Sequence, residues 1–251
     1  MTGPGARREE CGGHLAVTLC RPDKLNALDE ATIAALTAWL SDPGEVRFVV
    51  LRGDGPSFRA GADVASLAES GTLDARTRES MALQRMLEAA SRCPAPLVAA
   101  VRGHALGAGC ALVSCADIVI AETTASFGIP EVRAGVIPAI VAAFVELRMS
   151  RGQARRYLLS GRRFDAAEAY RLGFADMVTD DLESAIAEVG DELRSCGPEA
   201  LRRTKRLLTE QPSPIEQAVM MAEIRDSDEA REGLSAVREH RLPYWAQRPD
   251  D

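Results

Sequence analysis

The hydrophobic positions in the first half of the chain form short apolar runs, each closed off by turn residues. The runs have the length of strands, and stretches with helical spacing of apolar positions separate them. The predicted strands are His14 to Leu19, Val46 to Leu51, Leu97 to Val101 and Asp117 to Ala121. The predicted helices run from Glu30 to about Leu40, after Asp29 as N-cap, and from about Arg76 to Ser91. Strands that alternate with helices predict an α/β fold with crossover connections.

Helical spacing dominates from Pro138 onward. The predicted helices there cover about 138–148, 151–159, 165–171, 182–195, 198–209 and 214–238. We therefore expect a flexible N-terminal tail over residues 1–11, a core over 12–195 and a C-terminal helical region over 196–251.

The composition of the chain argues against several classes of binding partner and against a metal site. The 251 residues carry a formal net charge of −7 without a basic stripe, so we expect no nucleic acid and no membrane as partner. The sequence has no run of about 18 apolar residues, so we expect no membrane-spanning helix. The polar start of the chain lacks the apolar core of a signal peptide. Six cysteines without CxxC spacing are typical of reduced thiols and favour the cytoplasm. The three histidines are not spaced as metal ligands, so we expect no metal.

Two turns rich in small residues carry the candidate chemistry. Phe58 to Asp63 follows one apolar run, and Arg102 to Cys110 follows another and leads into a short helix that reaches about Ser114. Small residues allow backbone N–H groups to approach a ligand closely. Two such groups that converge on one carbonyl oxygen would form an oxyanion hole, which stabilises developing negative charge.

These turns and four further segments occur in an order and spacing that resemble the enoyl-CoA hydratase/isomerase (crotonase) superfamily. The resemblance covers about residues 12–248. Its segments are residues 21–28, 58–63, 101–109, 127–132 and 160–175, followed by Pro243 to Trp245 with Arg248. It implies a spiral of ββα units, a C-terminal helical trimerisation layer, and trimers that often pair into hexamers.

The resemblance also implies an acyl-CoA thioester as substrate, with its carbonyl between the backbone N–H groups of Ala62 and Ala108. Members of the family usually carry glycine where Ala108 stands. Coenzyme A, bound as part of the substrate, implies no separate cofactor. The residues that the resemblance places around it are Lys24, Ala60, Ala62, Asp63, Val64, Gly107 and Ala108.

Glu131 matches a catalytic glutamate of the hydratases, and a carboxylate there could move a proton at the acyl chain. The alternative is a solvated turn glutamate. Ala111 stands where the best-known hydratases carry their second glutamate, and a methyl group cannot hold or deprotonate water. The expected activity is therefore enoyl-CoA hydration or dehydration with one glutamate. The alternatives are Δ3–Δ2-enoyl-CoA isomerisation or other enolate chemistry, and an inactive acyl-CoA-binding protein.

Other residues have a functional and a structural interpretation each. Lys24 and Arg59 are candidates for the phosphates of coenzyme A or plain surface charges. Arg59 occupies a position where the family usually has a small residue, which would suit a specialised pocket. We expect Asp63 to cap a following helix.

We expect His104 to pack in the turn. Cys110 and Cys115 are expected to fill the core. Residues 137–143 vaguely resemble the branch that acts on glutaconyl-type esters, or they belong to an ordinary packed helix. An unrelated α/β hydrolase is not supported, because no GxSxG motif occurs. The acyl chain, the carrier (coenzyme A or acyl-carrier protein), and trimer versus hexamer stay open.

Overall fold

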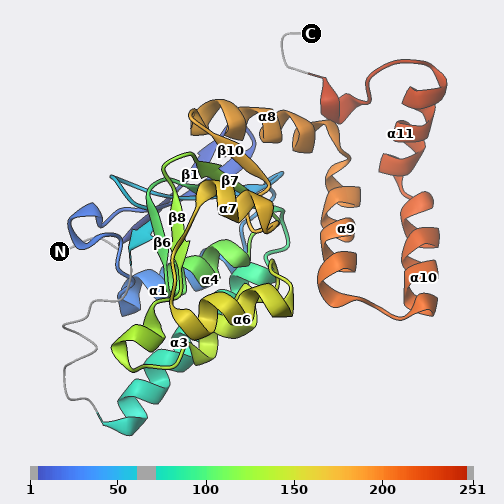
Figure 1. Cartoon of the computed structure of the whole chain (residues 1–251). Coiled ribbons are helices and arrows are strands. Elements are labelled where there is room, and N and C mark those ends of the chain that lie inside the picture. Colours follow the sequence, from blue (N-terminus) through green and yellow to red (C-terminus); the bar gives the residue numbers. More distant parts are fainter. Residues whose placement is uncertain (1–4, 61–71, 248–251) are drawn as a thin grey trace.

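Two β-sheets form the centre of the molecule in a computed structural model that describes residues 5–60 and 72–247 (Figure 1). The larger sheet has the order β1 (Ala6–Cys11), β2 (His14–Leu19), β3 (Val49–Gly53), β5 (Leu97–Val101), β7 (Ile118–Glu122) and β10 (Met177–Thr179). Its strands from β2 to β10 are parallel, whereas β1 is antiparallel to β2. The smaller sheet has the order β4 (Arg59–Ala60), β6 (His104–Leu106), β8 (Ser126–Gly128) and β9 (Phe164–Asp165). This is the α/β fold that the sequence predicts.

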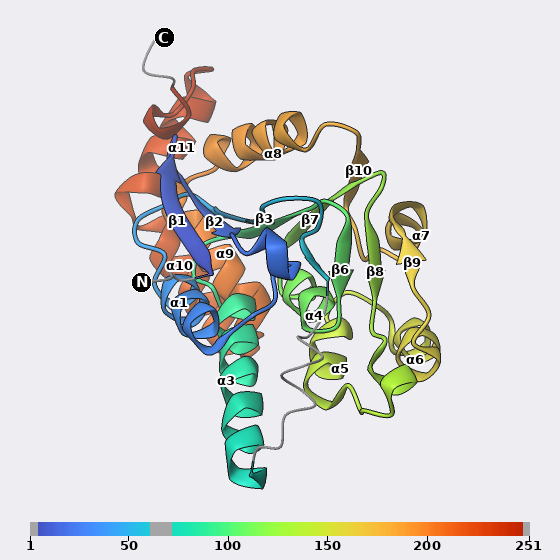
Figure 2. The same cartoon turned by 90° about the vertical axis from the view of Figure 1, so that its left-hand side faces the viewer.

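Helices lie on both sides of the larger sheet (Figure 2). Those of the core are α1 (Glu30–Ser41), α3 (Leu73–Ser91), α4 (Ala108–Ser114), α5 (Ala139–Val145), α6 (Arg151–Ser160), α7 (Ala166–Arg171) and α8 (Leu182–Ser195). The C-terminal helices are α9 (Pro198–Glu210), α10 (Pro214–Arg225) and α11 (Asp228–Arg238). Three short 3-10 helices are η1 (Pro22–Lys24), η2 (Glu131–Ala134) and η3 (Tyr244–Ala246). Within residues 5–60 and 72–247, no helix is both long and apolar enough to cross a membrane.

The central strands of the larger sheet, from β2 to β7, are largely buried on both faces, and this explains their continuous apolar runs. Successive residues of a strand point to opposite faces. Val98 and Ala100 of β5 therefore join the cluster beneath α8, whereas Leu97, Ala99 and Val101 join the main core. The main core also contains buried residues of α1, α3 and α4.

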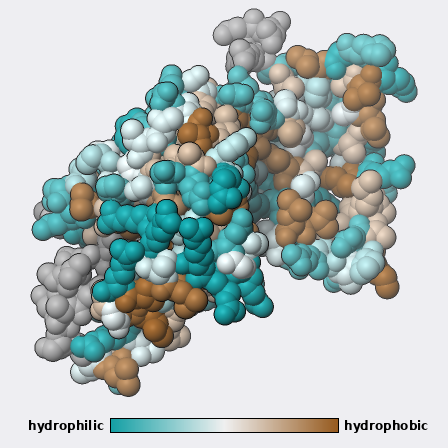
Figure 3. Space-filling view, in the orientation of Figure 1, coloured by the Kyte–Doolittle hydropathy of each residue, from teal (hydrophilic) through white to brown (hydrophobic). Residues whose placement is uncertain are grey.

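Helices α9, α10 and α11 extend away from the two sheets (Figure 1). Their apolar side chains are in part exposed, and Figure 3 shows hydrophobic residues across this part of the surface. The exposed members are Leu208, Ile215, Val219, Met221, Leu234 and Val237. An exposed apolar surface of this kind is typical of an interface. A trimerisation layer remains a prediction.

Three expectations from the sequence need correction. A flexible tail over residues 1–11 is wrong for residues 6–11, which form β1. A two-residue turn at Gly12 and Gly13, with φ of +52° and +81°, pairs β1 with β2. A single helix over 214–238 is also wrong, because Ser227 caps a new helix by accepting a hydrogen bond from Ala230 N at 3.1 Å. The predicted strand from Val46 begins only at Val49.

Candidate active site

The turn between β6 and α4 presents backbone N–H groups at the centre of the molecule. Gly107 has φ of +56° and ψ of −123°, a conformation open mainly to glycine, and its own N–H donates to Gly128 O at 2.8 Å. Helix α4 begins at Ala108, which is buried. The first N–H groups of a helix have no acceptor within it, so Ala108 can offer its N–H to a ligand. The partner N–H expected at Ala62 lies outside the described residues.

The carboxylate of Glu131 lies against this turn, although 24 positions of sequence separate it from Gly107. A Cβ atom added to Gly107 would stand 2.7 Å from Oε1 of Glu131. The other carboxylate oxygen, Oε2, is buried and has no hydrogen-bond partner within residues 5–60 and 72–247. Burial raises the pKa of Glu131; its own backbone N–H and the charge of Arg59 act in the opposite direction. The structure therefore brings together the glutamate and the N–H-bearing turn that the sequence singles out.

A second charged side chain, Arg59, lies in the same place. It is 5% exposed, and its Nη1 donates to Leu106 O at 3.1 Å, whereas Nε has no hydrogen-bond partner in the part of the chain that the structure describes. Its Cβ, carbonyl oxygen and Cδ lie 3.0 to 3.1 Å from the position of a Cβ on Gly109. Burial lowers the pKa of Arg59 to about 10, and the nearby Glu131 carboxylate counteracts this. Arg59 stays a cation at neutral pH and is too deeply buried to be the surface charge considered above.

Helix α4 supplies no second carboxylate. Ala111 is fully buried in the apolar core, one turn after Ala108. Cys110 on the same helix and Cys115 directly after it are buried, as expected for core residues. Burial raises the pKa of both thiols, so neither is an activated nucleophile.

Hydrogen bonds of Leu25 and Asn26 connect the loop that contains Lys24 to β4 and to the segment before it. Asn26 is buried, and its Nδ2 donates to Asp54 O at 2.9 Å and to Ser57 O at 2.8 Å. Ala60 N donates to Leu25 O at 3.0 Å, which ties this loop to β4. Asn26 was missed as a structural residue, although its left-handed backbone, with φ of +56°, is one that asparagine tolerates.

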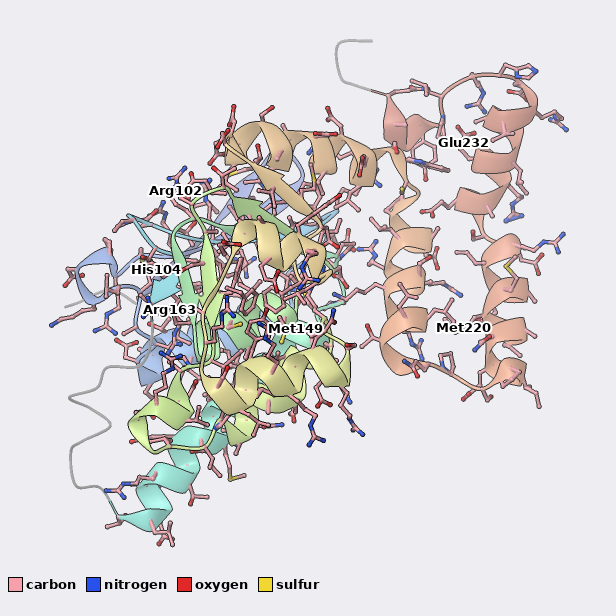
Figure 4. All side chains as sticks on the ribbon, in the orientation of Figure 1. Arg102, His104, Met149, Arg163, Met220 and Glu232 are labelled. Atoms are coloured by element: carbon pink, nitrogen blue, oxygen red, sulfur yellow. The ribbon has the colours of Figure 1, made fainter. Side chains whose placement is uncertain are left out.

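The remaining candidates are distributed as follows. Lys24 is exposed at the end of η1, where a cation is free to meet a phosphate. Asp63 and Val64 lie outside the described residues. His104 is exposed on β6, with Nδ1 2.7 Å from Ser126 Oγ, so the expectation that it packs inside the turn is wrong (Figure 4). Among the residues that the structure describes, no cluster of three or more His, Cys, Asp or Glu could hold a metal ion.

The family model described as "Enoyl-CoA hydratase/isomerase" matches residues 9–248. The chain belongs to this family. A putative enoyl-CoA hydratase of Thermus thermophilus is 34% identical over 249 residues, covering 93% of this chain and 98% of the relative. The 2,3-dehydroadipyl-CoA hydratase of Escherichia coli is 30% identical over 246 residues, covering 93% and 95%.

Solved structures of similar proteins show the same fold. Pseudomonas aeruginosa AtuE is 36% identical with a TM-score of 0.92, covering 97% of this chain and 100% of that one. An enoyl-CoA hydratase from Shewanella pealeana is 31% identical with a TM-score of 0.89, covering 96% of each chain. The crotonase fold predicted from the sequence motifs is thus confirmed, and the protein is an enzyme of the hydratase or isomerase type.

Proposed function

We propose that this enzyme adds water to, or removes it from, an enoyl-CoA thioester, with Glu131 as its acid and base. The observation that carries the proposal is the position of the Glu131 carboxylate beside Gly107, with Oε1 2.7 Å from where a Cβ of that residue would stand. The carboxylate therefore lies next to the residue that precedes Ala108, whose N–H has no acceptor within α4. Relatives that bear hydratase names support the choice of reaction.

The chemistry would depend on charge that develops on the thioester oxygen. The Ala108 N–H, at the positive end of α4, would donate to that oxygen, together with the N–H expected at Ala62. Hydrogen bonds to the thioester oxygen make Cβ of the enoyl ester electrophilic, and the enolate that forms after addition at Cβ is basic at Cα. Burial raises the pKa of Glu131, which makes its carboxylate a better proton acceptor. No resident cofactor is part of this proposal, and coenzyme A enters only with the substrate.

The exposed Lys24 would meet the phosphates of coenzyme A, because a cation at the surface can bind them without being desolvated. Ala60, Asp63, Val64 and Gly107 would complete the binding of the thioester. A homotrimer or a dimer of trimers in the cytoplasm is part of the same proposal.

Isomerisation from Δ3- to Δ2-enoyl-CoA is the second candidate, and the buried methyl group of Ala111 favours it. Moving a double bond needs a proton to leave one carbon and arrive at another, which a single carboxylate can perform. Hydration also requires water to be held. The inactive acyl-CoA-binding protein is the third outcome that an experiment must distinguish.

The test is mass spectrometry of enoyl-CoA esters incubated with the protein in D2O. Gain of one water on a 2-enoyl ester is the expected result. Double-bond migration, or deuterium uptake without added water, would instead assign the isomerase or another enolate-forming activity. The panel contains straight 2-enoyl, 3-enoyl and glutaconyl-type esters. If all of them bind but stay unchanged, the protein is an inactive acyl-CoA-binding protein.

A matched pair of variants ties any activity to the site. Glu131→Gln removes the proton-transferring group and should abolish turnover while acyl-CoA still binds. Glu10→Gln makes the same change on the exposed surface of β1 and should leave turnover unaltered. Equal activity in both variants would refute the role proposed for Glu131.

A further inference from the structure

Arg59 and Glu131 approach the same point of the turn from two different elements. The position of a Cβ on Gly107 lies 2.7 Å from Glu131 Oε1 and 4.0 Å from Arg59 Nη1. Arg59 comes from β4, and Glu131 from η2. Glu131 is also the one charged group that acts on Arg59 among the described residues.

The two side chains do not form a direct ion pair. Their charged atoms are further apart than 4.0 Å, the limit for such a pair. Each also keeps a buried atom that has no hydrogen-bond partner among the described residues, Nε of Arg59 and Oε2 of Glu131. Charged groups held close but not in contact, with hydrogen-bonding capacity left over, are commonly bridged by an oxygen that accepts from one and donates to the other.

Resting on the proposed hydratase function, we propose that Arg59 and Glu131 together hold the oxygen atom that is added to or removed from Cβ of the acyl chain. Arg59 thereby provides the second polar contact that Ala111 cannot make. A guanidinium only donates hydrogen bonds, so Arg59 orients the oxygen while Glu131 moves the protons. One cation and one carboxylate replace the pair of carboxylates.

The hydration step balances with these two groups. The water held by Arg59 gives one proton to the Glu131 carboxylate while its oxygen forms a bond to Cβ. The electron pair of the double bond moves toward the thioester and forms the enolate held at Ala108. Glu131 then returns the same proton to Cα and is again a carboxylate. One O–H bond and the π bond between Cα and Cβ break, and one C–O and one C–H bond form. In the reverse direction, Arg59 donates to the departing hydroxyl oxygen as Glu131 protonates it.

The experiment compares the binding of two ligands that differ by one hydroxyl group, a 3-hydroxyacyl-CoA and the saturated acyl-CoA of the same length. Calorimetry in the Glu131→Gln background keeps the hydroxy ester from being turned over. Loss of a hydrogen bond from a charged donor should weaken binding of the hydroxy ester about tenfold or more in Arg59→Met, and leave the saturated ester almost unchanged. Arg59→Lys, which keeps a charged donor, should restore part of the difference.

Arg133→Met is the matched control, because Arg133 lies on the same 3-10 helix as Glu131 but is exposed and donates to Ser160 O at 3.1 Å. It should leave the ratio of the two affinities unchanged. Equal weakening of both ligands by Arg59→Met would show that Arg59 only supports the pocket, and no weakening would show that it does not touch the oxygen. Either result overturns the proposal. Thermal unfolding of each variant establishes that it is folded.

Kinetics with Glu131 present separate this inference from the proposed function. In Arg59→Met, hydration of a 2-enoyl ester should fall about 100-fold, while deuterium exchange at Cα falls only a few-fold. Equal loss of both reactions would mean that Arg59 positions Glu131 rather than the water. A wild-type protein that fails to hydrate any ester refutes the proposed function. The ratio of the affinities for the hydroxy ester and the saturated ester, in contrast, tests the contact between Arg59 and the hydroxyl oxygen without any turnover.

Discussion

Replacing Gly107 with alanine tests the contact on which the candidate site depends. Gly107 has φ of +56° and ψ of −123°, and its missing Cβ leaves the room that Glu131 Oε1 occupies. The added methyl group would stand 2.7 Å from this oxygen, whereas ordinary van der Waals contact begins at 3.4 Å. The carboxylate must therefore retreat by several tenths of an ångström or change its rotamer.

Two costs follow, and they can be measured separately. A non-glycine residue in this backbone conformation loses about 1 to 3 kcal/mol of stability. Displacement of a catalytic group by a fraction of an ångström to 1 Å costs up to about 100-fold in rate, so kcat/KM should fall about 10- to 100-fold. Urea unfolding measures the first effect, and hydration of the best substrate of the panel measures the second.

Gly173→Ala is the matched control for the backbone cost. Gly173 has φ of +71°, and nothing lies within 4 Å of an added Cβ. Both variants should lose stability, but only Gly107→Ala should lose activity at a temperature at which both are folded. If the two variants retain the same kcat/KM, the closeness of Glu131 to Gly107 has no bearing on catalysis, and the reasoning is refuted.

Three further predictions concern stability. Lys205 is buried and pairs with the partly exposed Asp117 at 2.5 Å. Lys205→Met should therefore lower the free energy of unfolding in urea by about 2 kcal/mol, because it leaves the Asp117 carboxylate unpaired. Adding Asp117→Asn to Lys205→Met should make that loss smaller. Tyr157 donates to Glu168 at 2.6 Å, and Tyr157→Phe should cost about 1 kcal/mol in the same assay; no loss would show that water replaces the bond. Burial raises the pKa of Glu131, so the ionised form destabilises the folded state, and Glu131→Gln should raise Tm at neutral pH. That gain should disappear as the pH falls through the Glu131 pKa into the ordinary carboxyl range, and a gain independent of pH would contradict it.

The larger sheet could be predicted from the sequence because its central strands are buried on both faces. Such strands are continuous apolar runs, and β2 and β5 have the predicted bounds. Helix α1 was equally predictable, since Asp29 caps it by accepting a hydrogen bond from Thr32 N at 2.9 Å. Local chemistry determines both kinds of element.

The smaller sheet could not be predicted in the same way. Strands β4 and β9 have two residues each, and β6 and β8 have three, which is too short for any periodicity. They form because the larger sheet and the helices bring distant segments together. The strand β1 escaped prediction for another reason: five of its six residues are exposed, so its sequence resembles a polar tail.

The candidate site shows the same division. The glycines of the turn were predicted to bring the backbone close to a ligand, but their positions have a second physical cause. A Cβ on Gly107 would meet the Glu131 carboxylate, and a Cβ on Gly109 would meet the stem of Arg59. Glycine at these two positions thus leaves room for the side chains of Glu131 and Arg59. An arginine in a sequence is normally assigned to the surface, so its burial here could be recognised only once the packing around these glycines was known. Desolvating a cation is costly. Among the described residues, the carboxylate of Glu131 is the one that acts on the Arg59 guanidinium, and α4 contributes the methyl group of Ala111. A polar ligand between the two charges would account for the burial of Arg59.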